Sequence, residues 1–68
     1  MMLHQLGIQL RTLRNRRSWS VNDLALRAGL NPLSLRKIES GERRYPRIDT
    51  MVKIAQALGV SLDDLIKG

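Results

Sequence analysis

A helix stop and a helix start stand almost side by side near the middle of this 68-residue chain, and this feature constrains the fold most. Gly29 favours the left-handed conformation that commonly ends a helix. Only Leu30 separates it from Asn31-Pro32, a cap residue followed by a proline at the first helical position. The sequence therefore predicts two helices joined by a tight turn.

Capping signals and apolar spacing set the extent of these two helices. Ser20 begins the first, and Asp23 three residues later completes a capping box. The second runs from Asn31 to about Ser40 and stops at Gly41. The inward faces are formed by Leu24, Ala25 and Ala28 in the first helix and by Leu35 and Ile38 in the second.

The same rules predict three further helices. A first helix begins near the N-terminus and fades over residues 15–18; its apolar stripe is Leu3, Leu6, Leu10 and Leu13. A fourth helix, rich in apolar residues from Met51 to Leu58, stops at Gly59, and Ser61 caps a short fifth helix with Asp64 three residues on. Without strand alternation or a linker, residues 1–68 are expected to form one all-α, compact five-helix domain.

The charge distribution suggests a polyanionic partner. Net charge is +6, and residues 1–47 hold ten of the twelve Arg and Lys residues but three of the six acids. Nine of the basic residues are arginine, whose guanidinium suits phosphate. A solubilising surface charge is the alternative. No apolar run approaches the ~20 residues that span a bilayer, and no signal peptide is seen, so a cytoplasmic protein with no membrane partner is expected.

Catalysis, metals and cofactors are not expected. There is no cysteine, and His4, the one histidine, could not hold a metal alone. Asp23, Asp63 and Asp64 are explained as residues at helix starts, where the helix dipole favours acids. No nucleophile–base pair or phosphate-binding glycine loop is present.

Two helices around a tight turn form a helix-turn-helix candidate. Ala25 has to be small for the second helix to pack on it, and Gly29 permits the turn. Over residues 6–66 the chain resembles the phage repressor and Cro-like helix-turn-helix domains, the Xre family. The matching residues are Leu6-Gly7, Leu10, Leu13-Arg14, Trp19-Ser20, Leu24-Ala25, Ala28-Gly29-Leu30, Leu35, Ile38-Glu39, Gly41, Pro46 and residues 54–61.

The resemblance implies a DNA-binding surface. Residues 31–40 become the recognition helix in the major groove, and the family's base-reading positions fall on Pro32, Leu33, Arg36 and Lys37. Contacts to phosphate or the minor groove fall on Ser20, Val21, Arg43, Arg44 and Arg47. Many members carry glutamine where Val21 and Pro32 stand. Arg36 and Lys37 are therefore the main polar side chains left to read bases. Pro32 and Leu33 offer only apolar contact, as to a thymine methyl.

Other residues receive structural or open interpretations. The resemblance pairs Arg14 with Glu39 as a partly buried salt bridge. Trp19 is expected in the core or at its edge, and Tyr45 is expected to pack against the fold rather than to touch DNA. Arg17, like Arg16, is as compatible with a helix-end role as with DNA contact.

Two classes of function remain. One is an operator-binding regulator: a phage-type repressor, a restriction-modification controller or an antitoxin that represses its own operon, bacterial or phage in origin and associated with the nucleoid. It is expected to bind a palindromic operator as a homodimer, for which Val60, Leu62 and Ile66 are the candidate contacts unless they are simply core. The other is an antitoxin or protein-interaction module of the same fold, with a toxin or other protein as partner and weak DNA reading.

Overall fold

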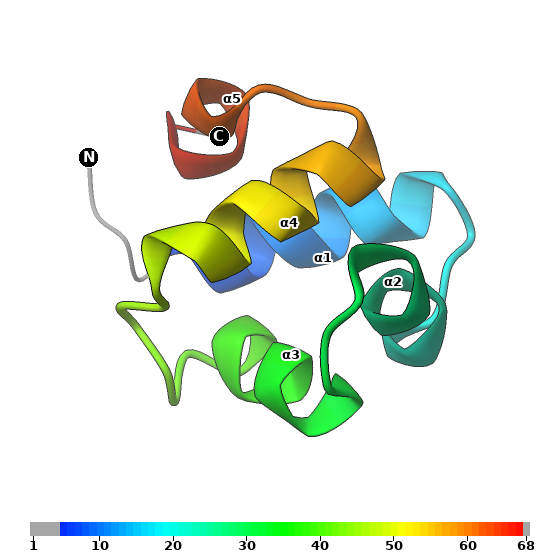
Figure 1. The fold of residues 1–68 in the computed structure, drawn as a ribbon, viewed down its shortest axis with the longest axis horizontal. Helices are drawn as coiled ribbons and strands as arrows, with labels where there is room; N and C mark the ends of the chain where they lie inside the picture. Colours follow the sequence, from blue (N-terminus) through cyan, green and yellow to red (C-terminus); the bar gives the residue numbers. More distant parts are fainter. Residues whose placement is uncertain (1–4, 68) are drawn as a thin grey trace.

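A computed structural model describes residues 5–67 and contains five α-helices and no strand in that range (Figure 1). The helices are α1 (Leu6–Arg16), α2 (Val21–Ala28), α3 (Pro32–Glu39), α4 (Ile48–Leu58) and α5 (Leu62–Lys67). This confirms the all-α, five-helix prediction with its helix-turn-helix. Leu3 and His4 lie outside the described residues.

The helix starts follow the capping residues that the sequence indicates. The Ser20 hydroxyl accepts a hydrogen bond from the Asp23 N–H at 3.0 Å, and the Asp23 carboxylate accepts one from the Ser20 N–H at 2.9 Å. These two bonds form the capping box at the start of α2. The Asn31 side chain accepts from the Leu33 N–H at 2.8 Å, at the start of α3. Both predicted caps are thus confirmed.

The tight turn between α2 and α3 depends on Gly29. Its φ of 69° lies in the left-handed region, which costs an L side chain energy but not glycine. Beyond it, the Leu30 N–H donates to the Ala25 carbonyl at 2.8 Å and closes the end of α2. The chain can therefore leave α2 and enter α3 within three residues.

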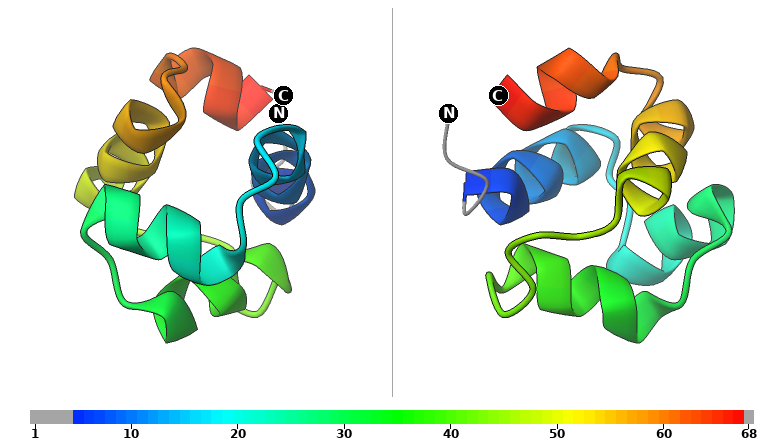
Figure 2. Two further views of the ribbon diagram at one scale, coloured as in Figure 1. Left: turned by 90° about the vertical axis from the view of Figure 1, so that its right-hand side faces the viewer. Right: turned by 60° about the vertical axis from the view of Figure 1, so that its left-hand side comes forward.

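The five helices surround one aliphatic core. In the views of Figures 1 and 2, α3 lies at one edge of the molecule and α5 at the opposite edge, with α1 and α4 between them. The most extensive contacts join α1 with α3, α1 with α5, α2 with α3, α2 with α4, and α4 with α5. The largest of the fully buried side chains are Leu6, Leu10, Leu24, Leu35, Ile38, Ile54, Leu58 and Leu65.

The backbones of α1 and α3 approach each other closely at Gly7. A methyl group added there would lie 2.5 Å from the Glu39 carbonyl oxygen and 2.7 Å from that of Ile38. Only hydrogen fits in this space, so Gly7 sets how near the end of α3 can lie to the start of α1. No helix within residues 5–67 combines the length and the apolar character needed to cross a bilayer.

Candidate nucleic-acid interface

The outward face of α3 is a shallow basic surface with one apolar residue. Leu33, Arg36, Lys37 and Ser40, which the helical spacing places together, line a hollow of about 210 Å³ with Glu42. Leu33 is 56% exposed and Arg36 is exposed, whereas Lys37 is partly buried. Pro32, the remaining predicted base-reading residue, is partly buried at the first position of α3.

This face points outward because the opposite face of α3 is fixed in the core. Leu35 and Ile38 are buried, and each is rotated about the helix axis by about 100° from the cation next to it and by about 160° from the other. Ala25 of α2 is also buried, in line with the small residue expected where the two helices pack. The recognition face is therefore presented by rigid packing and not by a loop.

The start of α2 presents a hydroxyl and backbone N–H groups. The Ser20 oxygen already accepts from Asp23, but a hydroxyl also carries one hydrogen to donate. Val21 is partly buried and packs against the core, so only its backbone could meet phosphate. Hydrogen bonds from the Ser20 backbone and side chain lower the pKa of Asp23, which keeps a negative charge close by.

The loop after α3 carries the exposed arginines Arg43, Arg44 and Arg47. The Arg43 N–H donates to the Lys37 carbonyl at 3.0 Å, which ties the start of the loop to α3. A second hollow, of about 390 Å³, is lined by Arg43, Tyr45, Pro46, Arg47 and Thr50. The loop thus extends the basic surface that begins on α3.

Tyr45 of this loop differs from expectation, and Arg47 makes an ion pair that the sequence did not indicate. Tyr45 is 77% exposed, so the prediction that it packs against the fold is wrong. The chain turns this ring outward and leaves Pro46 partly buried in its place. Arg47 precedes α4, and its Nε lies 3.4 Å from the carboxylate of Asp49, with both side chains mostly exposed. Such an exposed pair is weak and leaves the guanidinium available to a stronger anion.

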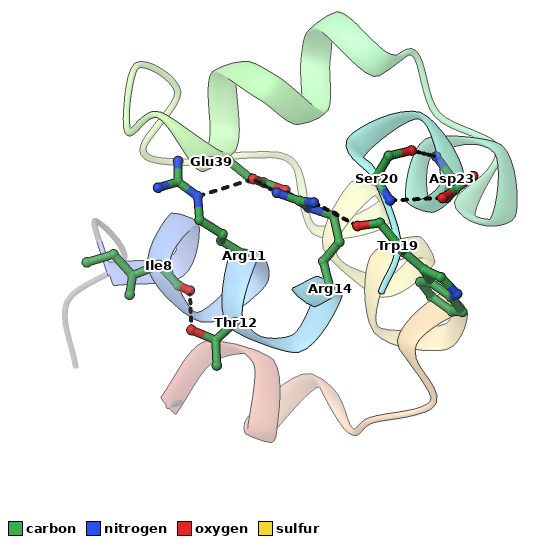
Figure 3. A network of polar contacts seen from close by, with 8 residues as sticks. All are labelled: Ile8, Arg11, Thr12, Arg14, Trp19, Ser20, Asp23 and Glu39. Atoms are coloured by element: carbon green, nitrogen blue, oxygen red, sulfur yellow. Dashed lines mark hydrogen bonds and ion pairs between the residues drawn. The ribbon is translucent and has the colours of Figure 1, made fainter. Parts of the chain in front are cut away.

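An ion pair joins α1 to the end of α3 (Figure 3). Arg14 donates from Nε to Glu39 Oε2 at 2.8 Å and from Nη2 to Oε1 at 2.9 Å. Its Nη1 also donates to the Trp19 carbonyl at 2.7 Å. The side chains are 12% and 4% exposed, and Arg11 adds a longer contact to Glu39 at 3.6 Å. The hydrogen bonds to Glu39 raise the pKa of Arg14, against the opposing effect of burial.

Arg17 has a structural role that the sequence left open. Its guanidinium donates to the Leu13 carbonyl at 2.8 Å and to the Leu58 carbonyl, so it satisfies the ends of α1 and α4 together. The ring of Trp19 lies near two cations, 4.2 Å from Arg27 and 5.7 Å from Arg17, measured from guanidinium carbon to ring centre. Trp19 is partly buried against the core, which confirms its core-edge prediction.

The candidate dimer residues Val60, Leu62 and Ile66 are partly buried and pack against the core. Both interpretations therefore remain open for them, since each keeps some surface for a partner. Ile48 and Val52, one turn apart on α4, are more exposed, at 60% and 37%. This exposed apolar pair was not singled out in the sequence, because helix periodicity alone does not tell an outer stripe from an inner one.

Comparison with protein families gives an independent view of the chain. The profile of HTH_3, described as a helix-turn-helix family, matches residues 10–65. Among curated proteins, the chain is 36% identical over 64 residues to the HTH-type transcriptional repressor RghR of Bacillus subtilis, covering 94% of this chain and 47% of that protein. The uncharacterised HTH-type regulator RghRB of the same organism is 40% identical over 60 residues, covering 88% and 43%. The chain thus spans less than half the length of these relatives.

Two solved structures match this chain over most of their own length. The restriction-modification controller protein C.AhdI from Aeromonas hydrophila superposes with a TM-score of 0.86 at 30% identity, covering 93% of this chain and 94% of that one. The N-terminal DNA-binding domain of SinR from Bacillus subtilis gives a TM-score of 0.88 at 29% identity, covering 91% and 90%.

Proposed function

The chain belongs to the HTH_3 helix-turn-helix family, and we propose on that premise that it binds double-stranded DNA as a sequence-specific transcriptional regulator, acting as a repressor. One observation carries the proposal. The buried residues Leu35 and Ile38 hold α3 so that Arg36 and Lys37 face outward, and none of the ion pairs between residues 5 and 67 includes either cation. Unpaired cations on a rigid helix suit both phosphate and guanine edges.

The surrounding residues divide into those that contact bases in the major groove and those that contact the DNA backbone or the minor groove. Pro32, Leu33, Arg36 and Lys37 lie on or beside the face that enters the major groove. Contacts to the sugar–phosphate backbone or minor groove come from Ser20, Arg43, Arg44 and Arg47, and from the backbone of Val21. The exposed loop arginines provide affinity through counterion release, while the α3 face provides sequence preference.

The regulator acts as a homodimer on a palindromic operator. A domain with extents of 27 × 21 × 20 Å reads few base pairs alone, and two copies reach half-sites about 34 Å apart, one helical turn of DNA. Val60, Leu62 and Ile66 offer part of their surface to the partner copy. The exposed pair Ile48 and Val52 on α4, which contacts α5, enlarges the candidate surface. We place this activity in the cytoplasm, where bacterial and phage operators lie.

A second candidate is a protein-interaction module, such as an antitoxin. The exposure of Leu33, Tyr45 and Ile48 favours it, because solvent-facing apolar side chains gather at protein interfaces. DNA binding fits the basic surface better than binding of an apolar protein partner. Such a partner, seated on Leu33, would also have to desolvate Arg36 and Lys37.

A duplex titration separates the two candidates. The chain is titrated with a random-sequence pool of duplex DNA at low and moderate salt, and bound duplexes are recovered and re-selected. Enrichment of one palindromic sequence supports an operator-binding regulator. Absence of any duplex binding at moderate salt leaves the interaction module as the better account.

A further inference from the structure

Leu33 is an exposed aliphatic side chain on an otherwise polar face. Its backbone N–H is held by the Asn31 side chain at 2.8 Å, which fixes the first turn of α3. Its own side chain remains 56% exposed. It adds little to the core, so its side chain is available to an apolar group of a ligand on the outward face.

Leu33 shares one hollow with cationic donors. The hollow of about 210 Å³ on the outer face of α3 has Leu33 as its only aliphatic lining residue, with Arg36, Lys37, Ser40 and Glu42 making up the rest. A fitting ligand therefore combines one small apolar group with hydrogen-bond acceptors a few ångströms away. The major-groove edge of DNA has this combination where a thymine methyl lies beside guanine N7 and O6.

Resting on the proposed DNA-binding function, we propose that Leu33 selects a thymine by contact with its C5-methyl group, while Arg36 donates to a guanine in the neighbouring base pair. Arg36 is three positions after Leu33, a rise of about 4.5 Å along the helix axis. This is close to one base-pair step of about 3.4 Å. The two side chains, which line one hollow, are thus close enough together to reach adjacent base pairs.

The charge around Leu33 favours DNA over an apolar protein segment as its occupant. A purely apolar partner would cover Arg36 and Lys37 without offering acceptors, at the cost of desolvating two charges. DNA offers the methyl group, the guanine acceptors and phosphates together. 5-Methylcytosine carries the same methyl group as thymine, so both bases serve as probes of the contact.

The experiment removes single methyl groups from the DNA. Starting from the best duplex selected by the wild-type chain, each thymine is replaced in turn by deoxyuridine, and dissociation constants are measured at fixed salt. One thymine per half-site should respond, with a loss of about fourfold for one methyl group. In Leu33→Ala the same replacement should change affinity little. The wild-type chain should bind a duplex with 5-methylcytosine at that position more tightly than a duplex with cytosine there. Leu33→Ala should bind the two duplexes equally.

Ile8→Ala is the matched control. Ile8 is an aliphatic residue of the same size, 69% exposed on α1, and it lines a hollow with Ile66 of α5 rather than the hollow on α3. This variant should keep the full deoxyuridine penalty. Circular dichroism checks that both variants are folded.

The outcomes separate this inference from the function on which it rests. If every deoxyuridine duplex binds like its parent, or if Leu33→Ala retains the wild-type penalty, the methyl contact is refuted while DNA binding stands. A selected site without thymine also refutes it. If the wild type binds no duplex at moderate salt, the proposed function fails and the inference fails with it.

Discussion

The α-carbon of Gly7 faces the main-chain carbonyl of Glu39 so closely that a methyl group added at Gly7 would lie 2.5 Å from the oxygen. Gly7→Ala should therefore destabilise the fold, although alanine gains about 1 kcal/mol in helix propensity. The obstacle is backbone, which cannot rotate away, and overpacking costs about 1–3 kcal/mol. A lower urea midpoint than the wild type is expected. Arg16→Ala, at an exposed position of α1, is the control, and a raised midpoint for Gly7→Ala would contradict the close approach.

Removal of either partner of the Arg14–Glu39 pair should destabilise the fold. With side chains 12% and 4% exposed, the remaining charge is left largely buried and unpaired. The loss is up to about 3–5 kcal/mol for a fully buried pair. Arg11→Ala, whose side chain is 58% exposed, should cost no more than about 1 kcal/mol. Thermal unfolding measures all three variants. Unchanged midpoints for both Arg14→Ala and Glu39→Ala would mean that the pair adds nothing to stability.

Base-reading and backbone-binding residues should respond differently to sequence and salt. Arg36→Ala or Lys37→Ala should cost about 1–3 kcal/mol on the preferred duplex and relax preference at one base position. Arg43→Ala and Arg44→Ala should weaken all duplexes alike and reduce the salt slope by about one unit each. Binding is measured on preferred and scrambled duplexes at several salt concentrations. An equal loss on both duplexes for Arg36→Ala and Lys37→Ala would show that α3 does not read sequence.

Arg47 should show an intermediate behaviour. In a minor groove its guanidinium senses the narrow width of A·T-rich DNA without a base code. Arg47→Ala should therefore lose more affinity for operators with an A·T-rich segment beside the half-site than for operators without one. Asp49→Ala should gain affinity, because it frees Arg47 from its ion pair. Duplexes that differ only in that segment provide the measurement. A loss that does not depend on the segment would place Arg47 on phosphate instead.

The number of chains bound should depend on the number of half-sites in the DNA. Sedimentation should find two chains on a palindromic duplex and one on a single half-site. Ile48→Lys should weaken the two-chain complex, because a charge would enter an apolar contact, while Leu26→Lys, at a position 84% exposed on α2, should not. One chain per palindrome, with no dimer in the free protein, would refute the dimer proposal.

Helix boundaries were predictable because they depend on neighbours in the chain. The capping box at Ser20, the cap at Asn31 and the left-handed Gly29 each act within a few residues of their own position. Such local rules need no knowledge of the tertiary structure. They also placed Leu35 and Ile38 inward, and hence Arg36 and Lys37 outward.

Contacts between distant segments were not predictable in the same way. In the sequence, Gly7 is a residue of low helix propensity within a helix. Its role becomes clear only from the structure, where α3 packs against it. Arg17 bonds to the carbonyl of Leu58, 41 residues away, which no local pattern encodes. Tyr45 could have packed inward or outward, because a loop has no periodicity to fix the direction of its side chains. The Arg14–Glu39 pair was available only through the family resemblance.

The position of Trp19 gives this domain its own optical probe. It is the chain's one tryptophan, its ring lies close to two guanidinium groups, and it immediately precedes Ser20, whose hydroxyl we propose to contact phosphate. Indole emission responds to nearby charge and to water. Fluorescence of the unlabelled protein can therefore follow two events separately: unfolding, which releases the ring from both cations, and docking on DNA, which brings a phosphate close to the ring if Ser20 makes the proposed contact.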